Sequence, residues 1–382
     1  MAIFSGEYRL KSIENNQSSL TLDSLSVRIL FLLLRIALGK EEPSSLPNSI
    51  NWQDVYDLSL RQGVGAIACD GMLALKECSI DEELRYKWMG QSMVIEQNYY
   101  QHKKALINLA NFYEEKKIRM LLLKGYGLSL NYPIPEHRPA GDIDIYLFDG
   151  DTNCPVWDKG DNSIKEAYNI KVDNSHHHHT TFVFEGQSVE NHYDFINVYA
   201  HKSNKRIEQA LKSFAMKDYR FLDNSVIVPS DNFNALFILK HCASHFASTG
   251  IKIRNILDWL LFVEKYGCFV EWEKIYEVYR RENLDRFAAI VNAIGVKMLK
   301  FPKDLFFEVE EDLAIVNRVL EDIICPEFKE KEKGTISSSL WVKPRRWWSN
   351  RWKHDICYSD SLISSFFHSF YAKLLKPSHF IR

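Results

Sequence analysis

Apolar residues recur at helical spacing along the first part of the chain. The most apolar run begins at Val27 and contains Arg28 and Arg35. It is shorter than the roughly 20 apolar residues that cross a bilayer, so we interpret it as a buried helix. Three stretches place apolar side chains three or four positions apart, which is typical of helices that bury one face: residues 22–38, 51–75 and 81–108.

The pattern changes after a charged segment that ends at residue 117. Residues 117–123 (KIRMLLL) form a short apolar run, which predicts a buried strand. Residues 141–148 (GDIDIYLF) alternate with a period of two, which predicts a second strand. Two further strand-like runs, TTFVFEG and SVENHYDFINV, meet near Glu185-Gly186-Gln187. This arrangement predicts a β-hairpin.

Helical spacing resumes near residue 203 and continues to about residue 300. A polar interruption at residues 329–339 (KEKEKGTISSS) predicts a loop or linker. The pattern therefore predicts a small α/β unit between two helical regions. The predicted helices of the second region are residues 203–216, 231–247, 253–267, 272–283 and 285–300.

Charge and cysteine content narrow the class of protein. The chain has 382 residues and a net charge of −2, so it shows no overall electrostatic commitment to nucleic acid or membranes. Its 7 cysteines are scattered and form no CxxC pair, which favours reduced thiols over a disulfide framework or a zinc site. The N-terminal residues are polar and of mixed charge, unlike a signal peptide. We therefore expect a cytoplasmic protein without a transmembrane segment.

Two aspartates lie on the second predicted strand. Asp142 and Asp144 are two positions apart, so their side chains share a face, about 7 Å apart along the strand. Ile143, Ile145 and Leu147 fill the opposite face. At an effective dielectric of about 20, two such charges repel by roughly 2 kcal/mol. A core strand that carries both needs a counter-charge, a raised pKa or a divalent cation such as Mg²⁺. The alternative is a pair of edge-strand acids that face water.

Further motifs surround the aspartates. In chain order they are Leu122-Leu123-Lys124-Gly125, Tyr132-Pro133, Arg138-Pro139-Ala140-Gly141-Asp142-Ile143-Asp144-Ile145 and Glu190-Asn191-His192. Together they resemble the uncharacterised nucleotidyltransferase family called nucleotidyltransferase family 5, of the polymerase-beta-like superfamily. The resemblance implies an α+β protein with a small mixed-sheet nucleotidyltransferase-like core at residues 106–203. Helical regions at residues 1–105 and 204–382 would flank that core.

The resemblance also implies a chemistry. Asp142 and Asp144 would hold Mg²⁺ or Mn²⁺, and Glu190 would be the third carboxylate. His192 shares a strand face with Glu190, and Asp194 continues that face as a rival third acid. A hydroxyl of the acceptor would attack the α-phosphorus of an NTP, and pyrophosphate would leave. The acceptor could be a small molecule, a saccharide, a protein or an RNA.

One motif departs from better-studied members of the superfamily, which carry Gly-Ser after the first strand to hold the triphosphate. This chain has Lys124-Gly125-Tyr126-Gly127. The glycines still let the backbone approach phosphate at a helix N-terminus, and Lys124 could replace the serine contact as a point charge. The missing serine leaves open a catalytically inactive nucleotidyltransferase-fold module that binds nucleotide or a partner. Three acids converging within about 5 Å at an open cleft would favour the enzyme.

A run of four histidines, His176 to His179, precedes one predicted strand. Consecutive strand residues alternate between faces, so at most two of these rings could aim at one ion. We interpret the run as the exposed start of a strand with incidental metal affinity. The alternative is that His177 or His179 reaches the active site.

Two charged or polar pairs lie four positions apart on predicted helices. His241 and His245 share a helix face; they either pack in a cleft or help bind base, phosphate or acceptor. Arg254 and Asp258 have the same spacing and predict an intrahelical ion pair worth about 0.3–0.5 kcal/mol. The alternative has Arg254 facing the triphosphate. Arg138, just before the aspartate strand, could be structural or could contact phosphate.

The segment KPRRWWSNRWK, residues 343–353, combines basic residues with three tryptophans. Such interleaving can stack bases or lie at a membrane interface. The commoner outcome, which we favour, is tryptophan packed into the helical region with the basic side chains in water.

Overall fold

The computed structural model describes residues 21–43, 46–47, 49–222, 225–326 and 349–365. It confirms the predicted fold class, α+β, with helices on both sides of a six-stranded mixed sheet. The strands are β1 (Ile118–Leu122), β2 (Ile143–Asp149), β3 (His179–Phe184), β4 (Gln187–His192), β5 (Arg220–Phe221) and β6 (Val226–Val228). Their order across the sheet is β3-β4-β2-β1-β6-β5.

The N-terminal helices confirm the apolar periodicity. They are α1 (Leu25–Ala37), α2 (Trp52–Arg61), α3 (Gly65–Leu73) and α4 (Glu82–Glu115). The side chain of Ser24 caps α1 by accepting a hydrogen bond from the backbone N–H of Val27. Most of α1 is buried among other helices, as its apolar sequence predicts. No helix in the described part of the chain is long and apolar enough to cross a membrane.

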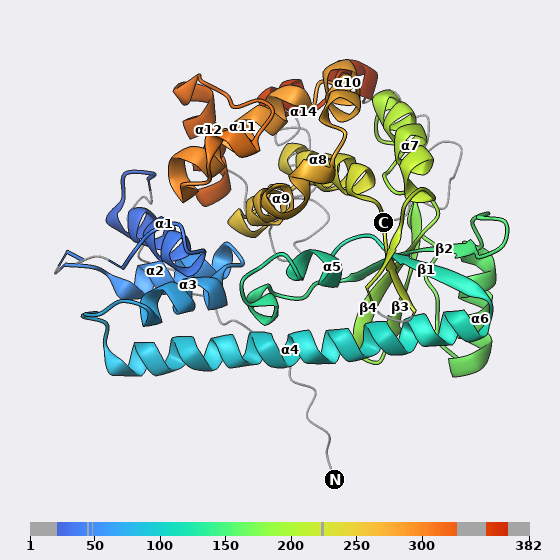
Figure 1. The fold of residues 1–382 in the computed structure, drawn as a ribbon, viewed down its shortest axis with the longest axis horizontal. Helices are drawn as coiled ribbons and strands as arrows, with labels where there is room; N and C mark the ends of the chain where they lie inside the picture. Colours follow the sequence, from blue (N-terminus) through green and yellow to red (C-terminus); the bar gives the residue numbers. More distant parts are fainter. Residues whose placement is uncertain (1–20, 44–45, 48, 223–224, 327–348, 366–382) are drawn as a thin grey trace, which may run out of the picture.

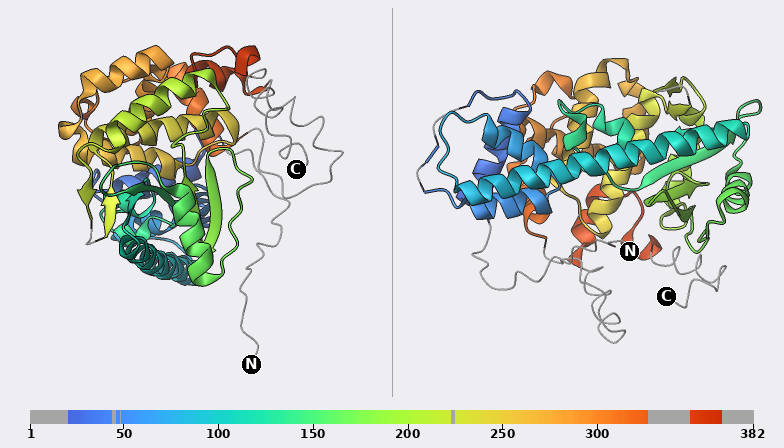
Figure 2. Two further views of the ribbon diagram at one scale, coloured as in Figure 1. Left: turned by 90° about the vertical axis from the view of Figure 1, so that its right-hand side faces the viewer. Right: turned by 90° about the horizontal axis from the view of Figure 1, so that it is seen from below.

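The remaining helices pack above the sheet or beside it. They are α5 (Tyr126–Ser129), α6 (Trp157–Tyr168), α7 (Lys202–Ala215), α8 (Asp231–Ser248), α9 (Ile253–Tyr266), α10 (Trp272–Glu282), α11 (Asp285–Leu299), α12 (Leu313–Ile324) and α14 (Arg351–Cys357). Short 3₁₀ turns occur at Pro135–His137, Gly267–Phe269 and Lys303–Leu305. The long helix α4 runs under the whole molecule, from the N-terminal helices to the sheet (Figure 1). Figure 2 shows the same helix across the face seen from below.

Strand alternation separates two apolar cores. On one face of the sheet, Ile143, Ile145 and Leu147 of β2 pack with α4 and with Ile164 of α6. On the other face, Tyr146 and Phe148 join a larger core that extends through α7, α8 and α9. This alternation places Asp144 on the face toward α8, among helices of the second core.

The hairpin was predicted correctly, and the sheet extends further than the sequence suggested. Glu185 and Gly186 both have positive φ, at 47° and 79°, which suits a two-residue turn between twisted strands. β4 ends at His192, earlier than the predicted strand run. β5 and β6 come from beyond residue 203 and extend the sheet next to β1. The division of the chain at residues 105 and 203 stays a prediction.

Candidate active site

The polar residues of the sheet gather on neighbouring strands. β2 and β4 run parallel, and Asp144 lies directly opposite Glu190. β3 and β4 run antiparallel, and His179 lies opposite His192. Since side chains alternate along a strand, these four residues share one face of the sheet. The sequence predicted that Glu190 and His192 share a strand face, and the pairing of β2 with β4 brings Asp144 to the same face.

Asp144 is buried at the centre of this group. Its side chain is 1% exposed. Its Oδ1 lies 3.1 Å from the Lys124 Nζ and 3.2 Å from the His192 Nε2. Its Oδ2 is buried and has no hydrogen-bond partner. Burial alone would raise the pKa of Asp144, but Lys124 and His192 hold it below its usual value. The residue is therefore an ionised carboxylate with one oxygen unused.

Glu190 and His192 complete the group. The His192 Nε2 lies 3.4 Å from the Glu190 Oε2, and its Nδ1 donates to the backbone oxygen of Asp194. Burial opposes charge on His192, but Asp144 and Glu190 raise its pKa above the usual value. One ligand atom from each of Asp144, Glu190 and His192 lies within 4.8 Å of the other two. That spacing suits a shared divalent ion after small side-chain movements.

Asp142 stands at the edge of this group, one residue before β2. Its side chain faces the cleft described below, and its pKa is raised by burial, by Glu190 and by Asp144. The repulsion predicted between the two aspartates is therefore present. The counter-charges Lys124 and His192 offset the repulsion at Asp144, whereas at Asp142 the repulsion appears as a raised pKa. The rival acid Asp194 lies beyond β4 and binds Lys212 at 2.7 Å.

The turn after β1 carries Lys124 and Gly125. Gly125 has a φ of 73°, and a side chain there would lie 3.5 Å from the backbone oxygen of Asp142. That distance is an ordinary van der Waals contact, so the backbone conformation, and not space, favours glycine here. The following helix, α5, is one turn long, so it adds little dipole. Lys124 reaches across to α8, where its Nζ lies 3.3 Å from the His241 Nε2.

A cleft of about 390 Å³ opens beside the acids. The Lys124-Gly125 turn, Asp142 and Asp144 form its sheet side. Helices α8 and α9 form the opposite side. The lining of the cleft thus combines the carboxylates of Asp142, Asp144 and Asp258 with basic side chains. Its basic or imidazole side chains are Lys124, Arg138, His241, His245, Lys252 and Arg254.

Arg138 and Asp258 form the closest ion pair of the cleft wall. The Arg138 Nε and Nη2 lie 2.7 Å and 2.9 Å from the two oxygens of Asp258. Tyr132 donates to the same carboxylate at 2.8 Å. The predicted pairing of Arg254 with Asp258 along one helix is therefore wrong, since Asp258 binds an arginine 120 residues away. Arg138 is buried, and its bidentate pairing supports the structural interpretation.

Arg254 consequently faces the cleft with few partners. Its Nη1 donates to the backbone oxygen of Pro139 at 3.3 Å, and its Nε is buried without a hydrogen-bond partner. Burial and the nearby Arg138 lower the pKa of its guanidinium. An anion in the cleft would relieve both effects, which fits the alternative in which Arg254 faces a phosphate.

His241 and His245 take different places. Burial and Lys124 hold the pKa of His241 well below its usual value, so its neutral Nε2 accepts from Lys124. His245 is exposed and pairs through Nδ1 with the Thr249 hydroxyl at 3.2 Å. Neither belongs to a candidate metal group among the described residues. The two histidines line the cleft without forming a zinc site.

The histidine run leads into β3 and approaches the acids at one point. Of its four members, His179 lies nearest, with its Nε2 3.8 Å from the Glu190 Oε1. Burial lowers the pKa of His178 to about 2 and that of His179 to about 4, so both rings are neutral at neutral pH. His179 is one of the two histidines that the sequence proposed as reaching the site. The preferred interpretation, an exposed start of a strand, is wrong for this residue, because it is buried.

Two further residues near the site were not predicted from the sequence. His102 of α4 is buried, and its Nε2 lies 4.0 Å from where a Cβ on Gly125 would be. It precedes Ala105, Leu106 and Leu109 on the sheet-facing stripe of α4, and that helical spacing was its only signal. Lys252, at the start of α9, also lines the cleft. Nothing in its local sequence distinguishes it from a surface lysine.

The basic tryptophan-rich segment is partly outside the described residues, as is the predicted linker at 329–339. Where it is described, Trp352 packs against Phe246, and the guanidinium of Arg318 lies over its ring at 4.1 Å. Lys353 pairs with Asp322 at 2.6 Å. These contacts support the predicted packing of Trp352 into the helical region. The prediction that the basic side chains lie in water is wrong for Lys353, which is buried.

Comparison with known families agrees with this geometry. The sequence model of a family described as uncharacterised nucleotidyltransferase matches residues 48–299. That match spans most of the chain, including every sheet strand and the cleft. The chain belongs to this family, as the resemblance of its motifs predicted. Searches of curated proteins and of solved structures each find no match.

Proposed function

We propose that this protein is a metal-dependent nucleotidyltransferase that transfers a nucleoside monophosphate from an NTP to an acceptor hydroxyl. The observation that carries the proposal is the convergence of Asp144, Glu190 and His192 within 4.8 Å, beside a cleft lined by cations. Family membership supports nucleotidyl transfer in general. The metal, the nucleotide and the acceptor are part of the proposal.

The residues present fit a divalent ion. Asp144 Oδ2 is a buried carboxylate oxygen without a partner, which is an unusual state for such an atom. Glu190 and Asp142 supply further carboxylate oxygens on the same side, which suit Mg²⁺, while the nitrogen of His192 is better tolerated by Mn²⁺. Bound at these residues, an ion would neutralise charge that develops on the attacking and leaving oxygens.

The cleft supplies the remaining functions through its own side chains. Lys124 and Arg254 can donate hydrogen bonds to triphosphate oxygens, each as a charge-assisted contact. The positive φ of Gly125 leaves its backbone close to the cleft without a side chain in the way. In the proposed reaction the acceptor hydroxyl loses its proton, its oxygen bonds to the α-phosphorus, and the bond to pyrophosphate breaks. Positioning and charge neutralisation provide most of the catalysis.

The test is to incubate the full-length protein with each of the four α-labelled NTPs, Mg²⁺ or Mn²⁺, and a cell lysate. We expect label from one NTP to appear on an acceptor with the wild type and not with Asp144→Asn. Asp149→Asn is the matched control, because Asp149 lies on the same strand but accepts hydrogen bonds from its own turn, at Asp151 and Thr152. Its activity should equal that of the wild type.

Other results would support the inactive module. NTP binding without label transfer under any of these conditions would contradict the proposed enzyme and favour a nucleotide-binding role. Transfer that persists in Asp144→Asn would place the chemistry elsewhere. A protein that binds no nucleotide would favour a module that recognises a partner.

A further inference from the structure

Beside the carboxylates lies a cluster of imidazole rings, of which the proposed reaction uses only His192. His179 begins β3, His178 immediately precedes it, and His192 ends the neighbouring strand β4. The ring centres of His178 and His179 are 4.4 Å apart, and those of His179 and His192 are 5.1 Å apart. Three imidazoles from two strands therefore meet at one edge of the sheet.

Three ring nitrogens of His178 and His179 are buried without hydrogen-bond partners. His179 is 6% exposed, and neither of its ring nitrogens has a hydrogen bond. The Nδ1 of His178 is also buried and unpartnered. Buried polar side-chain atoms nearly always have a hydrogen-bond partner, because leaving one unpaired is unfavourable. Three such nitrogens on adjacent residues need a common explanation, and a bound ligand with electron-pair acceptor character would provide it.

The spacing and chemistry of the cluster indicate which ligand. A ring nitrogen from each of His178, His179 and His192 lies within 4.8 Å of the other two. Nitrogens around a tetrahedral zinc ion, each at about 2.0–2.1 Å, are about 3.4 Å apart, so modest ring rotations would close the set. Imidazole suits Zn²⁺, Cu²⁺ and Ni²⁺, whereas Mg²⁺ prefers oxygen.

We propose that His178, His179 and His192 bind a divalent transition-metal ion of the zinc class. This ion site shares His192 with the group that His192 forms with Asp144 and Glu190, so two ions would compete for that ring. It does not require the proposed transfer reaction. His192 links the two sites, because its Nε2 also contacts the Asp144 Oδ1 at 3.2 Å. An ion at the histidines therefore changes the surroundings of Asp144, and each ion alters the affinity of the other.

The test uses the tag-free, full-length protein after treatment with a chelator. Co²⁺ is titrated as the probe and followed by its visible ligand-field bands, and Zn²⁺ is then added in competition. We expect one Co²⁺ per chain with the spectrum of a nitrogen-rich site, displaced by Zn²⁺. His179→Ala should weaken binding at least tenfold. His178→Gln, at a less buried position, provides a second variant if His179→Ala folds poorly.

Two controls separate this proposal from a surface effect and from the transfer reaction. His176→Ala removes an exposed histidine of the same run, and it should bind Co²⁺ like the wild type. Asp144→Asn should keep the nitrogen-type Co²⁺ spectrum even if it loses Mn²⁺ binding and transfer. Absence of Co²⁺ binding in the wild type would overturn the proposal. So would an unchanged affinity in both His178→Gln and His179→Ala, or an equal loss in His176→Ala.

Discussion

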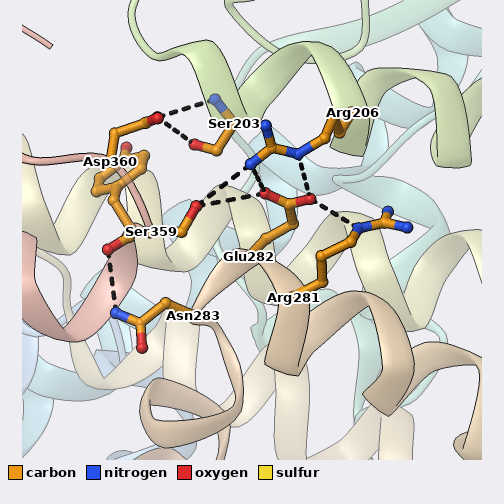
Figure 3. A network of polar contacts seen from close by, with 8 residues as sticks. Ser203, Arg206, Arg281, Glu282, Asn283, Ser359 and Asp360 are labelled. Atoms are coloured by element: carbon orange, nitrogen blue, oxygen red, sulfur yellow. Dashed lines mark hydrogen bonds and ion pairs between the residues drawn. The ribbon is translucent and has the colours of Figure 1, made fainter. Parts of the chain in front are cut away.

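Two buried carboxylates of this protein have opposite surroundings. Glu282, the last residue of α10, is fully buried and has both oxygens paired: Arg206 donates to them at 2.7 Å and 2.6 Å, and Arg281 donates at 2.9 Å (Figure 3). Asp144 is equally buried, yet its Oδ2 has no partner. The network around Glu282 joins α7 to α10, and both oxygens of the carboxylate are fully paired within the protein. The network around Asp144 leaves one carboxylate oxygen available to a ligand beside the cleft.

This difference indicates that Glu282 contributes to stability and Asp144 to function. Neighbouring arginines lower the pKa of Glu282 against the effect of burial and satisfy it without any ligand. Asp144 depends on Lys124, which lines the cleft, and on His192, which also contacts Glu190. We therefore expect the substitution of Glu282 to affect folding and that of Asp144 to affect ligand binding and catalysis.

The largest expected effect is on catalysis at Asp144. Asp144→Asn should lower the rate of nucleotidyl transfer at least about 1000-fold, or about 4 kcal/mol of transition-state stabilisation. The amide cannot neutralise a cation, although it retains the shape of the carboxylate. Initial rates, measured with the NTP that labels an acceptor in the transfer assay, would test this. Comparable loss in Glu282→Gln, scored per folded molecule, would remove the distinction between the two carboxylates.

Glu282→Gln should instead lower the free energy of unfolding, by about 3 kcal/mol. This is at the low end for a broken buried ion pair, because Arg206 and Arg281 reach solvent at 41% and 50% exposure. Urea unfolding at neutral pH measures the change. Glu308→Gln is a suitable control, since its ion pair with Arg280 lies at the surface and should contribute less than about 1 kcal/mol.

A third buried charge extends the comparison to a group with no counter-ion contact. Lys240 of α8 is fully buried, its Nζ has no hydrogen bond, and it lies 3.9 Å from the centre of the Tyr358 ring. Burial lowers its pKa to about 7, against smaller opposing effects of Cys357, Asp360 and Glu282. Between about pH 7 and pH 10 the unfolded chain therefore binds more protons at this residue than the folded protein does.

Stability from Lys240 should accordingly rise with pH across that window. Lys240→Met should stabilise the protein by about 2 kcal/mol near pH 7, with the gain shrinking as the pH approaches 10. Urea unfolding of wild type and variant at several pH values measures the difference. A gain that stays constant over the range would show that packing, and not the buried charge, is responsible.

The smallest expected effect is on nucleotide affinity at Arg254. Arg254→Ala should weaken NTP binding about tenfold, because one charge-assisted contact to phosphate is lost. Calorimetric titration with a non-hydrolysable NTP gives the ratio. Arg280→Ala, at an exposed helix position away from the cleft, should bind the NTP normally. Equal affinity of wild type and Arg254→Ala would show that the triphosphate does not use this wall.

Apolar periodicity predicted those helices and strands in which buried side chains recur at regular intervals along the chain. Helices α1 to α4 and α7 to α11, the strands β1 and β2, and the hairpin β3–β4 all follow such patterns. Helix α6 was missed, because its sequence WDKGDNSIKEAY buries few apolar side chains, chiefly Ile164. β5 and β6 have two and three residues, too few for alternation to be visible, and β6 is fixed by pairing with distant β1.

The site was predictable where it depends on local spacing and less so where it depends on long-range contacts. Strand alternation placed Asp142 and Asp144 on one side, and the family resemblance supplied Glu190 and His192. Asp258 was assigned to Arg254, its neighbour in sequence, because no single-sequence pattern pairs it with Arg138. The contact between Lys124 and His241 spans 117 positions and was missed for the same reason.

The most direct test of the central claim is a crystal structure with Mn²⁺ and a non-hydrolysable NTP. We predict an anomalous manganese peak at coordination distance from carboxylate oxygens of both Asp144 and Glu190. The triphosphate should lie between Lys124 on the sheet side of the cleft and Arg254 on the opposite side. A bound triphosphate with no manganese at those carboxylates, or manganese bound only elsewhere, would contradict the account.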